Sequence, residues 1–583
     1  MDIPGLSWLT GAIFDKELRV SSRRRRNYVL RFVYLSLMTI FLALVWVEEV
    51  RSGSSLYIAS RMGRAGQNIV VFIVWFQFCA VQLVALVALS TAISDEIHNR
   101  TLPALMTTPI SSFQIVTGKL MSKLLQIILL MGISLPLLAT VRVFGGVPWR
   151  FVVLSLCVTL LCVLFIGLFS LFLSIFCKRS YVVMLINLLG LGVMFGLLPL
   201  IIGYVVMEGF DVSENVFFKW LSVFNPYILL ALETDRMMSS YGSGIPPSFL
   251  PGCLVTMLTG CGVLFLLSVV MVRKVALLQA TGQLGKRPVI FEPKTDPGSK
   301  ARQSIVAAPI KRVVGPPVLW REMVRPVFGR HRKWFIIVMV LAVLLLFITY
   351  AIAAAENALD DNETHMVYAG IMLGLGMLFA IILPATCITS EKESRAWPLL
   401  MLTTLSENEV LLGKFVGALR RIVPAYFLLM GHVVLFCMFG IIHPIAIPQI
   451  GMIVMWVTVF LCGTGLYFST LFKHTTTAVI VNFALALTLW LLLPLFLAML
   501  GEVTRSGDNL VETYMNGNPV FQAAVVMDAT AHGGWSLHPY HWCEFRMGFL
   551  ESTFFMFSVM VFHVFIGLLF TWRAKCRLRK NIL

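Results

Sequence analysis

The sequence predicts an all-α polytopic membrane protein, with about twelve transmembrane helices arranged as two parallel six-helix repeats. Three observations predict this fold: the composition, the spacing of long apolar runs and an internal repeat. Of the 583 residues, 58% are hydrophobic and only 13% are charged. Because soluble globular proteins carry about 25% charged residues, this composition excludes an ordinary soluble enzyme and a disordered chain.

Long apolar runs form two sets of six. Each run is long enough to cross ~30 Å of hydrocarbon as a helix. The runs span about 28–47, 69–93, 120–141, 151–176, 181–206 and 250–272, and then about 334–354, 366–388, 422–442, 449–472, 478–501 and 552–572. Arg420 and Arg421 precede the ninth run and push its predicted start to Ile422.

The basic residues predict the orientation of the chain. On the side of the membrane that holds both termini, the loops and tails contain 36 Lys and Arg residues, against 9 on the other side. Cytosolic segments of membrane proteins carry the excess of Lys and Arg. We therefore expect a multi-pass plasma-membrane protein of the bacterial inner-membrane type, with both termini in the cytosol. This placement accounts for the net charge of +17, so we predict contact with the lipid bilayer and none with nucleic acid.

The apolar runs and the charges divide the chain into regions. We predict a cytosolic N-terminal amphipathic segment at 1–27, a first six-span unit at 28–272, a cytosolic linker with a second connecting helix at 273–333, a second six-span unit at 334–572 and a cytosolic basic tail at 573–583. The linker is rich in proline and basic residues, which is typical of an extended segment. Two outside segments, 207–249 and 502–551, predict short amphipathic helices at the outer membrane surface or dipping into it.

An internal repeat relates the two six-span units. When the sequence is shifted by 295 positions, ISDEIHNRTLPALMTTPISSFQIVTGK at 93–119 aligns without a gap with ITSEKESRAWPLLMLTTLSENEVLLGK at 388–414. The matches beyond this loop include Asn187 with Asn482, Asn225-Pro226 with Asn518-Pro519, and Lys16-Glu17 with Arg321-Glu322. We expect the asparagines within the spans to form interhelical hydrogen bonds. Because six is even, both units insert with the same orientation, which places a pseudo-twofold axis along the membrane normal and a pathway at their interface.

The most strongly repeated piece is the cytosolic loop between the second and third spans. The spacing i, i+3, i+4 predicts a short helix with one apolar stripe in each half, made of Leu102, Leu105 and Met106, and of Trp397, Leu400 and Met401. Pro103 and Pro398 fit only the first turn of such a helix, which we expect to last about two turns. The patterns Ser111-x-x-Gln114 and Ser406-x-x-Glu409 predict capping boxes that open the next helix. Because the chain has no cytosolic domain besides the linker, we predict that these stripes contact a partner protein.

The loop resembles the signature loop of type-2 ABC exporter permeases. In that family an acidic residue, a Thr-Leu pair, an LLTTPIS-like turn and a Gly-Lys pair follow the second span, as they do in DEIHNRTLPALMTTPISS…TGK. The second half departs from the pattern, with Ala396-Trp397 in place of Thr-Leu and Thr404-Leu405 in place of Pro-Ile. The resemblance covers the six-span layout of each half. It implies that the loop is a coupling helix that docks on an ATP-binding subunit.

The resemblance also implies roles for individual residues. Coupling to the ATPase partner is implied for Glu96, Arg100, Leu102, Leu105, Met106, Glu391, Arg395, Trp397, Leu400 and Met401. Amphipathic connecting helices are implied around Glu17 and Arg19, and around Trp320 and Glu322. The apolar residues would fill a groove on the partner, and the charged ones would fix the register. We expect two ATP-binding subunits, with room for further periplasmic or membrane components.

Catalytic motifs are missing from the sequence. None of the three Gly-Lys pairs belongs to G-x-x-x-x-G-K-[ST], so we predict no enzyme activity and no cofactor in this chain, with ATP hydrolysis in a partner subunit. We also predict no metal site. One outside cluster contains zinc or copper ligand types, but its spacing matches no standard motif: His532, His538, His541 and Cys543.

Two other functions stay open at the level of sequence. A twelve-span secondary transporter needs acidic groups for proton or sodium coupling, and no acidic residue lies deep in a predicted span. A non-transporting membrane scaffold or sensor would use the same spans without a pathway. We favour the membrane-spanning permease subunit of an ATP-driven exporter, which alternates access at the interface of its two halves.

Overall fold

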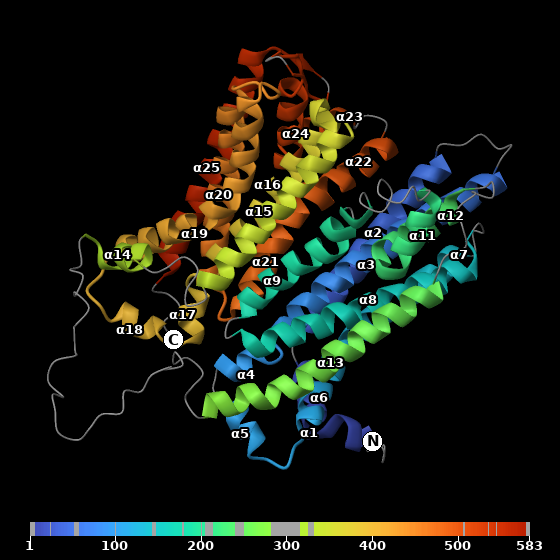
Figure 1. The fold of residues 1–583 in the computed structure, drawn as a ribbon, viewed down its shortest axis with the longest axis vertical. Coiled ribbons are helices and arrows are strands. Elements are labelled where there is room, and N and C mark those ends of the chain that lie inside the picture. The colour runs from blue at the N-terminus through green and yellow to red at the C-terminus, as the bar shows by residue number, and fades with distance from the viewer. Residues whose placement is uncertain are drawn as a thin grey trace.

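The computed structural model confirms an all-α polytopic membrane protein, with one helical bundle from each half of the sequence (Figure 1). The two bundles are inclined to one another in Figure 1. The structure describes residues 6–23, 25–51, 58–98, 101–142, 147–177, 180–199, 201–203, 214–239, 250–280, 315–324, 332–504, 508–533, 536–543 and 545–578.

The first bundle contains six long helical segments. They are α2 (Arg25–Arg51), α3 (Ile58–Ser90), α6 (Ser112–Gly132) with α7 (Ser134–Arg142), α8 (Trp149–Phe176), α9 (Ser180–Gly192) with the π-helical turn η2 (Val193–Leu197), and α13 (Leu250–Ala280). Short helices lie at both ends of the bundle in Figure 1: α1 (Leu6–Ser22), α4 (Ser94–His98) and α5 (Leu102–Met106) at one end, and α11 (Glu214–Phe224) and α12 (Pro226–Met238) at the other.

The second bundle repeats this order. Its long segments are α15 (Arg332–Ala355), α16 (Asn362–Thr386), α19 (Glu407–Met438), α20 (Ala446–Leu471), α21 (Thr475–Leu487) with the π-helical turn η5 (Thr488–Leu492) and α22 (Leu493–Thr504), and α25 (Phe549–Arg577). Its short elements are α14 (Pro317–Val324), α17 (Thr389–Glu393), α18 (Trp397–Met401), η4 (Ala358–Asp360), α23 (Asp508–Met515), α24 (Pro519–Thr530) and the antiparallel pair β1 (Tyr540–His541) and β2 (Arg546–Met547). We name the end that carries α1, α4 and α5, or α14, α17 and α18, the basic end of each bundle.

Ten of the predicted spans are helices long and apolar enough to cross a membrane. The first predicted span of each half lies in α2 and α15, whose described apolar stretches are shorter, Arg31–Ile40 and Val340–Ala355. The third spans begin earlier than the apolar runs predict, at Ser112 and Glu407. In α19, Arg420 and Arg421 precede the apolar run, and both contact α14. The helix therefore continues through these two residues.

In each half, the fourth span is the most buried of the helices that could cross a membrane. This span is α8 in the first half and α20 in the second. The contacts of α8 include α3 and α13, and those of α20 include α16 and α25. Glycines allow the close crossing of α20 and α25, since a Cβ on Gly567 would lie only 2.8 Å from the carbonyl oxygen of Val459. Small residues at helix crossings are the usual device for packing spans against one another.

The segments 207–249 and 502–551, which the sequence predicts to lie outside, contain short helices, and the second segment packs into its bundle. Val526 and Met527 of α24 are fully buried, and α24 contacts α16 and α20. The two halves meet through the first and fifth spans of the first half. The helix α2 contacts α22, and α9 contacts α16 and α21.

Candidate functional site

The repeated loops form the same structure in both halves. Each loop contains a short helix, α4 or α17, followed by a five-residue helix, α5 or α18, which has proline in its first turn. These proline-begun helices end at Met106 and Met401, slightly earlier than expected from the sequence. The loop therefore consists of two helical pieces, which a turn at Ser394 and Arg395 joins in the second half, and it leads directly into the third span.

Capping boxes fix the start of both third spans, as the sequence predicts. In the first half, Gln114 N donates to Ser111 Oγ at 3.2 Å and Ser111 N donates to Gln114 Oε1 at 3.1 Å. In the second half, the corresponding distances between Ser406 and Glu409 are 3.3 and 3.2 Å. Each box satisfies two backbone donors that a helix start leaves free. The turn between the proline-begun helix and the span is therefore well defined.

Two residues of the predicted apolar stripes, Leu102 and Trp397, face the chain itself, so these two are not open to a groove on a partner. Leu102 is fully buried and Trp397 is only 3% exposed. The helix α5 contacts α13, and both side chains belong to the hydrophobic core. Leu105, Leu400 and Met401 are half-buried, and the Met106 side chain and Arg100 lie outside the described residues. Periodicity identifies the apolar face of a short helix, and here the ends of neighbouring spans cover that face.

The opposite face of α18 carries the exposed apolar side chains. Leu399 is 69% exposed and Leu402 is 82% exposed. The same positions in the first half are Ala104 and Thr107, which are also exposed but smaller. Arg395 is exposed as well, and it begins the turn before α18 with a left-handed backbone, φ 56°. The second loop therefore presents the larger apolar surface to any partner.

An ion pair joins the first loop to the third span. Glu96 of α4 accepts from Lys119 Nζ of α6 at 3.0 Å and also accepts a short hydrogen bond from the Thr101 hydroxyl. Partial burial of Glu96 raises its pKa, but the Lys119 charge and these hydrogen bonds outweigh that effect, so the pKa lies below its usual value. Beside this pair, Glu17 of α1 lies 3.8 Å from Lys123. Arg19 of α1 is exposed.

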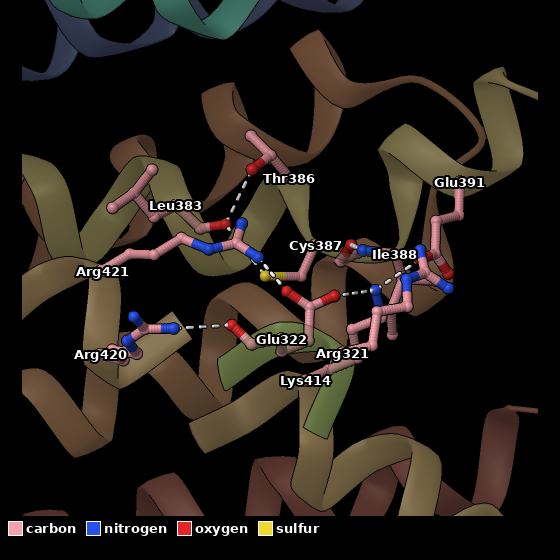
Figure 2. Close-up of polar contacts among 11 residues, drawn as sticks. Arg321, Glu322, Leu383, Thr386, Cys387, Ile388, Glu391, Lys414, Arg420 and Arg421 are labelled. Carbon is pink, nitrogen blue, oxygen red and sulfur yellow. Dashed lines mark hydrogen bonds and ion pairs between the residues drawn. The ribbon is translucent and has the colours of Figure 1, made fainter. Parts of the chain in front are cut away.

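The second half builds a larger network at the same place, and Figure 2 shows Glu322 of α14 at its centre. Lys414 Nζ of α19 lies 2.9 Å from Glu322 and 2.5 Å from Glu391 of α17. Arg421 contacts the other oxygen of Glu322, and Arg321 lies 3.0 Å from Glu391. The side chains of Glu322, Lys414 and Glu391 are 1%, 4% and 10% exposed. The network therefore joins the connecting helix, the third span and the loop in one buried cluster.

Glycine allows α14 to lie directly on α19. A Cβ on Gly413 would stand 2.8 Å from Val318 Cγ1 and 2.9 Å from the backbone nitrogen of Leu319. A Cβ on Gly417 would stand 2.8 Å from Glu322 Cβ. Arg420 then reaches the C-terminal end of α14 and donates to the Glu322 carbonyl oxygen at 3.1 Å, which suits a cation at a helix C-terminus. Trp320 of α14 is half-buried in this contact region.

Lys392 adds a further tie in the second half, where the first half uses a single hydrogen bond from Gln279 Nε2 of α13 to the Ile97 carbonyl oxygen at 2.9 Å. Its Nζ donates to three carbonyl oxygens at the end of α20: Ser469 at 3.0 Å, Thr470 at 2.6 Å and Phe472 at 3.1 Å. Burial, together with the nearby charges of Arg577 and Lys473, lowers the pKa of Lys392 to about 8. The first-half residue at this position is Ile97. The second loop is therefore fixed to two spans, α19 and α20.

The outside histidine cluster does not gather into one site. The rings of His532 and His538 stack with centroids 3.8 Å apart. Within the described ranges, no group of three or more His, Cys, Asp or Glu side chains is placed to hold a metal ion. His541 and Cys543 are exposed and belong to the β1–β2 turn region.

Several residues of this site could not be selected from the loop sequence. The sequence shows that Lys119 and Lys414 repeat, but it does not show their partners. The carboxylates that they bind are 23 positions away, in α4 and α17. Glu322 is 92 positions from Lys414. For Leu399 and Leu402 a signal existed, because they are three residues apart on the helix face opposite to the predicted stripe.

A comparison with known protein families matches this chain in two segments. The family is described as ABC-2 family transporter protein, and the matched residues are 11–277 and 327–516. These segments cover most of both halves, including α4–α6 and α17–α19. No curated protein matches the chain. Because the family match covers well over half of the sequence, this multi-pass membrane protein belongs to the ABC-2 family of transporter proteins.

Proposed function

We propose that this chain is the membrane-spanning permease subunit of an ATP-driven ABC exporter, in which the substrate moves by alternating access at the interface of the two halves. The observation that carries the proposal is the duplicated loop at the basic end. In each half it holds a short helix that ion pairs attach to the third span. A helix held in this way transmits displacement by a bound partner to the span, because it cannot bend away independently.

The exposed side chains of the loops are suited to an apolar groove on the partner. Leu399 of α18 and Leu402, which directly follows that helix, lie on one face and remain exposed in the part of the chain that the structure describes. An apolar surface that the chain leaves open is typical of a docking site. Ala104 and Thr107 provide less apolar area on α5, so the two docking sites have unequal strength. Glu391 and Glu96 would not contact the partner themselves. Their role is to fix the loops to the third spans.

The number of loops sets the composition of the complex. One chain contains both loops, so it suffices for two ATP-binding subunits, whereas two copies would need four and would leave redundant half-interfaces. We place the loops, both termini and the 273–333 linker in the cytosol, on the inner face of a bacterial inner membrane, because the excess of basic residues lies there. ATP hydrolysis belongs to the partner, since the sequence has no phosphate-binding loop.

The test is co-purification of the tagged chain from its own host, with ATP hydrolysis as the assay and mass spectrometry to identify the ATP-binding subunit by its phosphate-binding loop. We expect Leu399→Asp with Leu402→Asp to leave the chain inserted but to reduce the retained subunit and its ATPase activity about tenfold or more, because a buried unpaired carboxylate costs several kcal/mol.

Leu537→Asp is the matched control, since Leu537 is an exposed leucine between α24 and β1, away from the loops. We expect it to retain the partner fully. Native mass spectrometry of the unchanged complex should show one copy of this chain with two ATP-binding subunits. Full retention by the double variant, or a dominant species with two copies of the chain, would contradict the proposal.

A further inference from the structure

We propose that the two fifth spans are unequal: α9 is a hinged helix that swings about its π-helical turn, whereas α21 is fixed to its own bundle. The proposal names the moving part of the pathway interface. It stands on contacts within this chain and needs neither ATP nor a partner for its test. It can therefore fail while the proposed function holds, and the reverse is also true.

The π-helical turns occupy the same place in both halves, since Val193–Leu197 and Thr488–Leu492 are 295 positions apart. A π-helical turn widens the helix and disturbs its ladder of hydrogen bonds, so it is a natural bending point. In the first half, Asn225 Nδ2 donates to the Phe195 carbonyl oxygen within the turn at 2.7 Å. The same asparagine caps α12 by accepting from Tyr227 N at 3.0 Å. The far end of α9 is therefore anchored to α12.

The second half has the same anchor and one more. Asn518 Nδ2 donates to the Trp490 carbonyl oxygen at 2.8 Å and caps α24. In addition, the Tyr514 hydroxyl of α23 donates to the Leu489 carbonyl oxygen at 2.7 Å. Both fifth spans are thus held at their π-helical turns. The difference between them lies on the side of the turn toward the basic end.

On that side, a buried asparagine fixes α21 to two neighbouring spans. Asn482 Oδ1 accepts from the Thr464 hydroxyl of α20 at 2.8 Å, and Asn482 Nδ2 donates to the Ile381 carbonyl oxygen of α16 at 2.8 Å. Both polar ends of the amide are therefore used. Hydrogen bonds of this kind hold spans together where no water competes for them.

The corresponding asparagine of α9 fixes nothing. Asn187 is fully buried, and neither its Oδ1 nor its Nδ2 has a hydrogen-bond partner, which corrects the sequence expectation for this residue. The position of Thr464 is taken by Phe169 in the first half. The carbonyl oxygen of Leu86, which corresponds to that of Ile381, accepts from Ser170 Oγ at 3.3 Å instead. A buried amide without partners favours any displacement of α9 that supplies it with one.

Glycines surround the π-helical turn in the first half only. The first half has three glycines there, Gly190, Gly192 and Gly196. The matching positions of the second half hold leucines: Leu485, Leu487 and Leu491. A Cβ on Gly192 or Gly196 would meet no atom within 4 Å. Packing therefore does not require glycine at these two positions. What glycine supplies there is backbone freedom, which weakens a helix and eases bending.

The position of α9 makes this bending consequential. The helix contacts α16 and α21 of the second half, and Figure 1 shows it where the two bundles meet. Movement of α9 about η2 changes the contact between the halves while α21 stays with α16 and α20. On one side of the interface α9 therefore moves, whereas on the other side α21 stays in place.

The test is hydrogen exchange with mass spectrometry on the full chain in lipid nanodiscs, without nucleotide. Exchange reports local opening, which is faster where fewer bonds hold a segment. We expect amides of 180–192 to exchange roughly tenfold faster than those of 475–487. Equal rates in the two segments would overturn the proposal.

Substitutions of the asparagines and of the glycines assign the difference to its two causes. Asn482→Leu should raise exchange in 475–487 part of the way toward the rate of 180–192, whereas Asn187→Leu should not speed exchange in 180–192, because its amide has no bond to lose. Gly192→Ala with Gly196→Ala should slow exchange in 180–192 several-fold. Gly262→Ala in α13, where a Cβ also meets nothing within 4 Å, is the control and should leave that segment unchanged. No slowing in the double alanine variant would count against the hinge.

Discussion

Removal of Lys414 tests how strongly the second loop is tied to its span. Lys414 is 4% exposed and lies between Glu322 and Glu391, whose side chains are 1% and 10% exposed. Lys414→Met keeps most of the unbranched side chain but leaves two buried carboxylates without their shared cation. Breaking a buried ion pair costs about 3–5 kcal/mol, and Arg421 and Arg321 remain to compensate in part, so we expect about 3 kcal/mol.

The first half provides a matched control for this substitution. Lys119 occupies the same position and pairs with one carboxylate, Glu96, which is 22% exposed. Solvent near Glu96 can replace the lost cation, so Lys119→Met should cost about 1 kcal/mol. The difference of about 2 kcal/mol corresponds to roughly a thirtyfold difference in the unfolding equilibrium constant.

Unfolding of the purified chain in mixed micelles of dodecyl sulfate and a mild detergent, followed by tryptophan fluorescence, measures both values. A third variant separates charge from packing. Lys414→Met combined with Glu391→Gln removes one of the two carboxylates, leaves Glu322 paired with Arg421, and frees only Arg321, which is 44% exposed and can be solvated, so it should recover part of the lost stability. The reasoning would be refuted if Lys414→Met cost no more than Lys119→Met, or if the combined variant were less stable than Lys414→Met alone.

Two further predictions concern the helix crossing and the first loop. Gly463→Ala places a Cβ against the Gly567 carbonyl oxygen and should cost about 3 kcal/mol and lower the yield of monodisperse protein, whereas Gly451→Ala, with nothing within 4 Å, should not. Glu96 has a lowered pKa, so its contribution to stability is present above about pH 4.5 and is lost as the pH falls through its folded-state pKa. The melting temperature of the unchanged chain should therefore fall more steeply than that of Glu96→Gln between about pH 6 and about pH 3.5, and parallel pH profiles would contradict this assignment.

Local interactions explain why some parts of the loops could be predicted from the sequence. The capping boxes join residues three positions apart, and proline restricts its own first turn, so Ser111, Ser406 and the start of α18 follow from nearby residues alone. The environment of a short helix depends on distant parts of the chain. The stripe that contains Trp397 was identified correctly, but its burial depends on spans whose positions the loop sequence does not encode.

The asparagine pair illustrates the limit of an internal repeat as a predictor. Asn187 and Asn482 align, and alignment alone predicts the same hydrogen bonds for both. Their partners differ because Thr464 is replaced by Phe169 at the matching position, and an aromatic ring cannot donate to an amide oxygen. The repeat predicts which residues correspond, whereas the structure shows which correspondences retain their contacts.

These differences all point in the same direction. In the second half, Lys414 joins two carboxylates, Lys392 binds three carbonyl oxygens and Asn482 uses both ends of its amide. In the first half, the matching positions hold one ion pair at Lys119, an apolar Ile97 whose carbonyl oxygen accepts one hydrogen bond from Gln279, and an unpartnered Asn187. A symmetric dimer of six-span units cannot divide its contacts in this way, because every substitution appears in both subunits. Fusion of two units in one chain removes that constraint. The second half is therefore suited to serve as the rigid frame, against which α9 of the first half can move.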